Sequence, residues 1–362
     1  MKNFLASNKG IVAAGLLIGL VAVTLQKLGN PGNMGVCVVC FERDLAGSLG
    51  LHRAEIVQYA RPEIFALVLG SFVTALAVGE FRPRGGSSPV IRFFLGAVVS
   101  VGALVFLGCP WRALLRLAGG DWNAIFGLLG LICGIGAGTV FFRRNYSLGR
   151  NQPGRAGLGL IFPLFMLGLL VLRLMYPPIE GQAKNDFLFY SLSGPGSLHA
   201  ALGVSLAGGL IIGFLGQRSR FCTVGAFRDL ILFRQTHLLL GVLGFLAAAL
   251  VGNLLYGQFK PGFEGQPIAH TQSLWNFLGL FSAGLASVLA GGCPARQLFL
   301  AGEGDGDAAC FVLGLMAGAA MAHNWGLASS GAGIGPHGLA AVVGGLVITV
   351  FIAILFREKA AA

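Results

Sequence analysis

The sequence predicts an all-α, polytopic membrane protein. Of the 362 residues, 55% are hydrophobic and only 11% are charged, whereas about 25% of a soluble protein is charged. The mean hydropathy is +0.79. A net charge of +11 would suit nucleic acid if the basic residues shared one wet face, but most of them lie at the ends of apolar runs. Nucleic-acid binding is therefore excluded, and the lipid bilayer is the expected surroundings of the chain.

Apolar runs of membrane-spanning length define the expected helices, since about 20 apolar residues cross the hydrocarbon core. The first run follows Lys2 and Lys9. It is too long for a typical signal peptide and lacks a convincing cleavage pattern, so we expect it to be retained. About ten transmembrane helices are predicted, near 8–28, 62–80, 89–108, 122–142, 156–176, 197–216, 236–256, 272–291, 307–325 and 338–356.

The distribution of basic residues indicates the orientation, because cytoplasmic loops are enriched in Lys and Arg. With the N-terminus inside and ten spans, sixteen of the 25 Lys and Arg residues fall on the inner side. The loop FRRNYSLGRNQPGR at 142–155 contributes most to this bias. We therefore expect a multi-pass protein of the cell (inner) membrane with both termini in the cytoplasm.

An internal repeat links the two halves of the chain. MGVCVVCFERDLAGSL at 34–49 matches SRFCTVGAFRDLILF at 219–233, and LGCPWRALLRLAGGD at 107–121 matches GGCPARQLFLAGEGD at 291–305. The first and sixth spans are then equivalent and lie five crossings apart, so the second copy is inserted upside down. Inverted repeats are typical of transporters with a central site. The expected divisions are a first repeat at 1–142, a basic inner loop and linker span at 143–190, a second repeat at 191–325 and a C-terminal span at 326–362.

Each repeated block contains a cysteine followed by roughly 10 to 13 helix-compatible residues, which cover about half a membrane. We expect four re-entrant half-helices, two entering from each face. Pro110 and Pro294 favour the first helical position, which places the preceding cysteines at the N-caps. A helix N-terminus attracts anions and stabilises thiolate character. The candidate substrate path consists of the repeated cysteines, Cys37, Cys109, Cys222 and Cys293.

The repeated blocks also carry charged residues, which are costly inside a membrane. The two Arg-Asp pairs could be structural ion pairs or substrate contacts, and both interpretations stay open. The arginine three residues after the second cysteine of each copy could attract an anion or extend toward the interface. These accessory residues are Arg43, Asp44, Arg112, Arg228, Asp229 and Arg296.

The remaining thiols and the histidines do not indicate a cofactor. Cys40 forms a Cys-x-x-Cys motif with Cys37 that the second copy lacks, so we interpret it as an accessory thiol near the outer entrance. Cys133 and Cys310 lie alone in long spans and are expected to be packing residues. The six histidines are scattered, which favours no metal site. We predict no metal and no other cofactor.

At these motifs the chain resembles the YeeE/YedE family of membrane transporters, also called the sulfur-transport family. The carrying sequences are GVCVVCFERDL, GCPWRALLRLAGGD, RFCTVGAFRDLILF and GGCPARQLFLAGEGD. The RSRFCTVGAFRD block and the region from Cys37 to Arg61 are most similar to the YedE branch linked to selenium metabolism. The resemblance implies import of thiosulfate or a selenium analogue past the repeated cysteines, and a small cytoplasmic TusA-type sulfur carrier as partner.

Two other functions compete with a transporter. A membrane thiol enzyme could exchange persulfide or selenosulfide through Cys37 and Cys40, and would form a covalent adduct. A passive channel for neutral solutes would use the cysteines only for packing. We expect a transporter and not an enzyme, because single thiols at half-helix tips offer the several weak, soft contacts that conduction needs.

Overall fold

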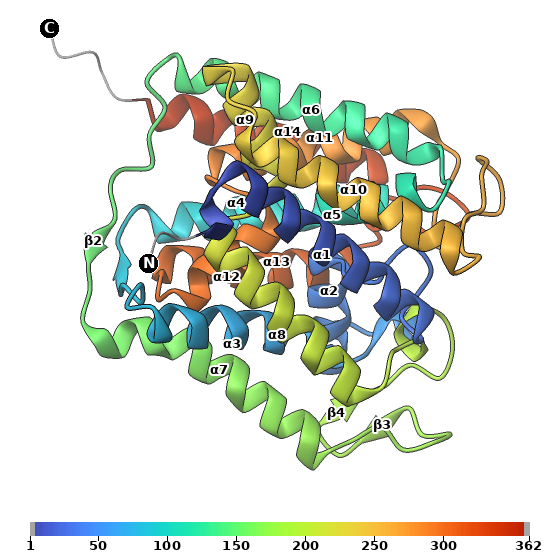
Figure 1. Ribbon diagram of the computed structural model, residues 1–362. Coiled ribbons are helices and arrows are strands. Elements are labelled where there is room, and N and C mark those ends of the chain that lie inside the picture. Colours follow the sequence, from blue (N-terminus) through green and yellow to red (C-terminus); the bar gives the residue numbers. More distant parts are fainter. Residues whose placement is uncertain (1–3, 358–362) are drawn as a thin grey trace, which may run out of the picture.

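The computed structural model describes residues 4–357 and confirms an all-α fold (Figure 1). Lys2 and Lys359, which count toward the predicted orientation, lie outside these residues. The strands within residues 4–357 form two minimal pairs, β1 (Arg84–Gly85) with β2 (Gln152–Pro153) and β3 (Lys184–Asn185) with β4 (Leu188–Phe189). These pairs fasten loops and build no sheet across the molecule.

Ten long helices correspond to the ten predicted spans. Within residues 4–357, nine stretches of helix are long and apolar enough to cross a membrane. The remaining predicted span, the sixth at 197–216, is helical only from Leu202, ends in the polar Gln217, Arg218 and Ser219, and is not among the nine. The helices are α1 (Asn8–Lys27), α3 (Pro62–Ala77), α4 (Pro89–Phe106), α6 (Asn123–Phe142), α7 (Ala156–Met175), α8 (Leu202–Ser219), α10 (His237–Leu255), α11 (Ser273–Leu289), α13 (Gly306–Asn324) and α14 (Gly338–Leu355).

Four short helices lie between the long ones. They are α2 (Val38–Ser48), α5 (Pro110–Ala118), α9 (Thr223–Phe233) and α12 (Pro294–Gly302). At 1.5 Å per residue, helices of 9 or 11 residues are about 14–17 Å long, half a bilayer. Short 3₁₀ turns at Phe4–Ala6, Glu55–Val57 and Pro195–Ser197 complete the elements.

The long helices pack in a pattern that occurs twice. α1 lies against α10, and its equivalent α8 lies against α3. In the same way α4 lies against α13, and its equivalent α11 lies against α6. Helix α1 runs from left to right in Figure 1, whereas α8 runs from right to left. This reciprocal packing supports an inverted duplication, for which we retain the predicted repeat boundaries as a proposal.

Glycines let the long helices approach closely, as small residues do in membrane bundles. The Gly134-x-Gly136-x-Gly138 sequence of α6 illustrates this. A Cβ on Gly134 would collide with the backbone of Phe281 on α11, and one on Gly138 would collide with Val288. Gly136 has only the tip of Ile231 nearby. Two of the three glycines therefore serve the α6–α11 contact.

Candidate functional site

The four repeated cysteines occupy equivalent positions, at the N-caps of the half-helices. They are Cys37 before α2, Cys109 before α5, Cys222 before α9 and Cys293 before α12. A proline occupies the first turn of α5 and α12, as the sequence predicts. None of the four cysteines is more than 5% exposed. Each thiol therefore lies at a helix end whose first backbone N–H groups have no partner within the helix.

The cysteines form two pairs that share one contact, from a backbone N–H to a thiol. The Cys37 Sγ lies 3.6 Å from the Cys109 Sγ, and the backbone N–H of Cys109 donates to the Cys37 Sγ at 3.5 Å. In the second pair the backbone N–H of Cys293 donates to the Cys222 Sγ at 3.4 Å. All four are free thiols. The inverted copies thus bring the cysteines together two by two, α2 with α5 and α9 with α12.

A left-handed turn precedes the second cysteine of each pair and determines its position. Leu107 has φ +65°, and the equivalent Gly291 has φ +96°. In both copies the next residue, Gly108 or Gly292, donates its N–H to a carbonyl five residues back. The left-handed region suits glycine and is unfavourable for leucine. The turn reverses the chain before the half-helix and so places the cysteine N–H against the partner thiol.

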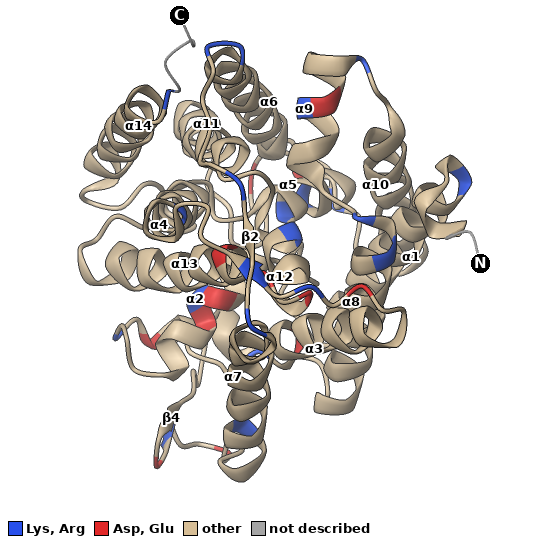
Figure 2. Cartoon of the chain, turned by 90° about the vertical axis from the view of Figure 1, so that its left-hand side faces the viewer, with Lys and Arg blue, Asp and Glu red and all other residues tan. Residues whose placement is uncertain are grey.

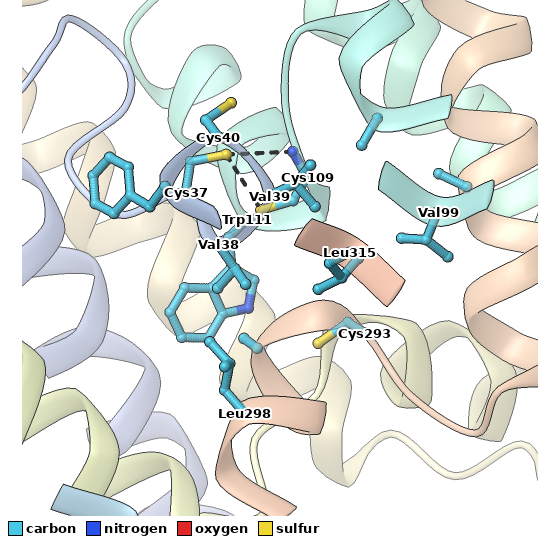
Figure 3. Packing of buried hydrophobic residues seen from close by; sticks show 14 of the residues in the cluster. Cys37, Val38, Val39, Cys40, Val99, Cys109, Trp111, Cys293, Leu298 and Leu315 are labelled. Carbon is cyan, nitrogen blue, oxygen red and sulfur yellow. Dashed lines mark hydrogen bonds between the residues drawn. The ribbon is translucent and has the colours of Figure 1, made fainter. Parts of the chain in front are cut away.

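The indole of Trp111 lies between the two pairs. Trp111 follows Cys109 on α5 and is 1% exposed. Its ring lies below the Cys37 and Cys109 sulfur atoms and beside Cys293 in Figure 3. Three aromatic rings surround it, with centroid distances of 5.6 Å to Phe221, 5.6 Å to Phe245 and 6.3 Å to Phe299. The centre of the molecule is therefore closed by an aromatic cluster.

Arg112 provides a buried positive charge beside the first pair. Its guanidinium donates to the carbonyls of Leu107, Asn33 (3.3 Å) and Ile268 (3.1 Å). Its Nη1 also lies 3.9 Å from the Cys40 Sγ. Arg112 forms no ion pair with a carboxylate among residues 4–357. Backbone dipoles alone compensate this charge, so an anion nearby would be attracted.

The predicted Arg43-Asp44 pair is part of a larger buried cluster. Asp44 accepts from Arg43 at 2.7 Å and from Arg61 at 2.7 Å, and all three side chains are nearly inaccessible. Arg61 precedes α3 and also donates to the carbonyls of Pro195 and Leu198. The cluster fastens α2 to α3 and to the loop before α8. This geometry favours the structural interpretation of the pair.

The equivalent charges in the second copy are more accessible. The Arg228 and Asp229 side chains, 2.8 Å apart, are 29% and 19% exposed. Arg296 lies 3.4 Å from Glu303, which is also 3.4 Å from Arg84 of the β1 segment. Figure 2 shows the β2 segment crossing this face of the molecule beside α12. Arg296, unlike its equivalent Arg112, already has a carboxylate partner.

Of the other thiols, Cys40 lies beside Cys37 (Figure 3), whereas Cys133 and Cys310 are on the long helices α6 and α13. Cys40 is fully buried, so the predicted position near an entrance does not make it accessible. Cys133 is exposed on α6 and is not the buried packing residue that we expected, while Cys310 is half-buried. No group of three or more metal-ligating side chains occurs within residues 4–357. The chemistry of the site is therefore that of thiols, backbone N–H groups and arginine.

Three residues near the site escaped the sequence analysis. Arg61 is distant in sequence from Asp44, and nothing local links the two. Trp111 aligns with Ala295 in the second copy, and this departure from the repeat is the available signal. Glu42 is fully buried, and neither carboxylate oxygen has a hydrogen-bond partner within residues 4–357. Glu42 lies outside the repeated Arg-Asp pattern, because Phe227 is the equivalent residue, so the repeat gives no signal for it.

The fold and the site define a polytopic helical membrane protein with paired half-helices and buried thiols. Residues 218–357 match the family model described as sulphur transport. The resemblance expected from the motifs is thereby confirmed over the second copy, which contains Cys222 and Cys293. The selenium branch is not distinguished by this match and stays a prediction.

Two curated relatives carry the same name. The chain is 31% identical over 96 residues to the thiosulfate transporter TsuA of Escherichia coli (strain K12), which covers 26% of this chain and 27% of that protein. It is 35% identical over 100 residues to the thiosulfate transporter TsuA of Spirochaeta thermophila, which covers 26% of this chain and 30% of that protein. The matches thus span less than a third of each relative. Both relatives are named as transporters and not as enzymes.

Proposed function

We propose that the protein imports a small sulfur-containing anion, thiosulfate or a selenium analogue, along a central path of cysteine thiols. The observation that carries the proposal is the repeated pairing of Cys37 with Cys109 and of Cys222 with Cys293, each at buried half-helix N-termini. The names of the relatives support thiosulfate as the cargo. The selenium analogue rests on the motif resemblance alone.

The chemistry of the pairs suits such a cargo. Thiosulfate has oxyanion oxygens at one end and a soft, polarizable sulfur at the other. Helix N-termini attract the negative charge, and thiols offer weak donors and polarizable contacts to the soft end. The two pairs provide successive weak sites, and conduction requires weak, multiple binding. The charge of Arg112, which no carboxylate within residues 4–357 offsets, favours anions on the side of the first pair.

The orientation and the partner are part of the proposal. The start of α1 and the end of α14 lie on the same side of the molecule (Figure 1). With the bias of Lys and Arg toward that side, we place both termini in the cytoplasm and the protein in the inner membrane. Cargo leaving the second pair would then reach a basic cytoplasmic face, where the resemblance implies a TusA-type carrier.

Uptake of labelled thiosulfate into proteoliposomes tests the proposal. Cys109→Ala and Cys293→Ala should each lower the initial rate at least tenfold, because each removes the only thiol of one half-helix tip. Cys133→Ala is the matched control, since Cys133 is exposed on α6. It should transport like the parent. Parental rates in both site variants would refute a path of thiols.

The intact mass of the protein distinguishes a covalent route from a non-covalent relay. The alternative thiol enzyme would carry cargo as a persulfide or selenosulfide on Cys37 or Cys40. The proposed relay needs only contact between neighbouring thiols, as between Cys37 and Cys109 at 3.6 Å. After incubation with thiosulfate, the intact mass under non-reducing conditions should be unchanged. A stable adduct on Cys37 or Cys40 would favour the enzyme.

A further inference from the structure

The side chain of Trp111 carries a donor that the fold leaves unused. The indole nitrogen is buried and has no hydrogen-bond acceptor within residues 4–357. Buried donors are usually satisfied, and an unsatisfied one is unfavourable and requires an explanation. The neighbouring Phe221, Phe245 and Phe299 offer only rings to the indole. They hold the orientation of the indole without using its N–H group.

The position of this donor coincides with the gap between the thiol pairs. In Figure 3 the indole nitrogen lies at the edge of the ring nearest to Cys293, while the Cys37 and Cys109 sulfur atoms lie above the ring. The indole therefore has the first pair above it and Cys293 of the second pair beside it, with its N–H group on the side of Cys293.

The two copies differ at this position. Trp111 is the second residue of α5, and the equivalent residue of α12 is Ala295. A symmetric path would have two large rings or two small side chains there. The combination of one tryptophan with one alanine lets a single indole fill the centre, close to the point where the inverted copies meet.

We infer that Trp111 determines the specificity of the proposed path. Its ring closes the path between the two thiol pairs, and its indole N–H donates a hydrogen bond to an oxyanion oxygen of the passing anion. The thiols contact the soft sulfur end, so the donor and the thiols recognise opposite ends of one ligand. The inference rests on the proposed transport of a sulfur oxyanion. It adds the residue that binds the oxygen atoms of that anion.

Trp111→Phe tests the donor, because phenylalanine retains an aromatic ring and removes the N–H group. A hydrogen bond to a charged ligand is worth a factor of about ten or more in binding. We expect the KM for thiosulfate to rise at least tenfold in Trp111→Phe. The matched control is Trp122→Phe, the same substitution at an exposed tryptophan, and it should leave KM unchanged.

Fluorescence gives a second measurement that does not depend on transport. A variant with Trp122, Trp275 and Trp325 replaced by phenylalanine keeps Trp111 as its single indole. Thiosulfate should change the emission of this variant in a saturable manner. This measurement decides the question if Trp111→Phe does not fold.

The outcomes separate the inference from the proposed function. If the parent takes up thiosulfate while Trp111→Phe keeps the parental KM, the inference is overturned and the proposed function stands. If thiosulfate does not change the emission of the single-indole variant, the inference is also overturned. A parent without thiosulfate uptake overturns both together.

Discussion

The two pairs of half-helices share one contact at their thiols and differ in how they are anchored. In α2 and α5 the supporting charges are buried, and Arg116 with Asp121, 2.6 Å apart, adds a second inaccessible ion pair. In α9 only Thr223–Ala226 is buried, and its Arg-Asp pair is partly exposed. The thiol contact is nevertheless repeated. The positions of the cysteines therefore depend on the backbone turns and N-caps that both copies share. The ion pairs differ between the copies and anchor each one separately.

The anchoring also divides the molecule into a tightly held and a loosely held side. Elements that move are drawn from regions with few buried contacts and exposed charges. By that criterion α9 belongs to the side that yields, whereas α12 is largely buried. The Arg61 contacts with the loop before α8 hold the opposite side in place. Four experiments test this contrast, taken from the largest expected effect to the smallest.

The largest effect is expected on stability, from Asp44→Asn. The change leaves the buried charges of Arg43 and Arg61 without their shared carboxylate, which costs about 3–5 kcal/mol of unfolding free energy. The equivalent Asp229→Asn, at a more accessible ion pair, should cost less than about 1 kcal/mol. Unfolding in detergent micelles measures both variants. Equal losses of unfolding free energy in the two variants would contradict the proposal that the first copy is more firmly anchored than the second.

A smaller effect is expected on transport, from Arg112→Gln. At an effective dielectric constant of about 20, a charge about 8 Å away contributes about 2 kcal/mol, or roughly thirtyfold in affinity. Thiosulfate uptake should fall by about that factor, because no carboxylate within residues 4–357 offsets Arg112. Arg112→Lys keeps the charge and should retain most of the uptake.

Arg296→Gln serves as the comparison for Arg112→Gln. The charge of Arg296 is already offset by Glu303, so we expect its loss to lower uptake by only about twofold to threefold. A loss as large as that of Arg112→Gln would mean that both copies attract the anion alike.

Thiol labelling should report the difference in mobility. With a small maleimide, Cys222 should react about tenfold faster than Cys37, because a local opening that is easier by 1.4 kcal/mol is ten times more populated. Peptide mass spectrometry after timed labelling measures each rate. The unfolded protein, labelled under the same conditions, gives the rate of an unprotected thiol. Faster labelling of Cys37 than of Cys222 would reverse the assignment of the loose side.

The smallest effect is expected from Glu42→Gln. Neither oxygen of Glu42 accepts a hydrogen bond within residues 4–357, so the amide of the same shape loses no partner. The unfolding free energy should stay within about 1 kcal/mol of the parent. A loss comparable to that of Asp44→Asn would reveal a partner that the present geometry does not contain, and would show that Asp44 alone does not account for the anchoring of α2.

The spans, the half-helices and the N-cap cysteines were predictable because each depends on local sequence. Apolar length defines a crossing, and Cys-Pro defines a helix start. The packing of α1 on α10 was implied only through the repeat. The contact of Arg61 with Asp44 and the central position of Trp111 were not predictable. They depend on how distant helices meet, and the sequence marks Trp111 only by its departure from the repeat, in which Ala295 is the equivalent residue.

The turn that precedes each second cysteine is formed at a different backbone cost in the two copies. Leu107 stands in a left-handed conformation that is unfavourable for leucine, whereas Gly291 takes the same conformation without steric cost. Arginines hold both joints, since Arg112 donates to the Leu107 carbonyl and Arg92 donates to the Ala290 carbonyl at 2.6 Å. The first copy therefore carries backbone strain beside its thiol pair that the second copy avoids, without any difference in the thiols themselves.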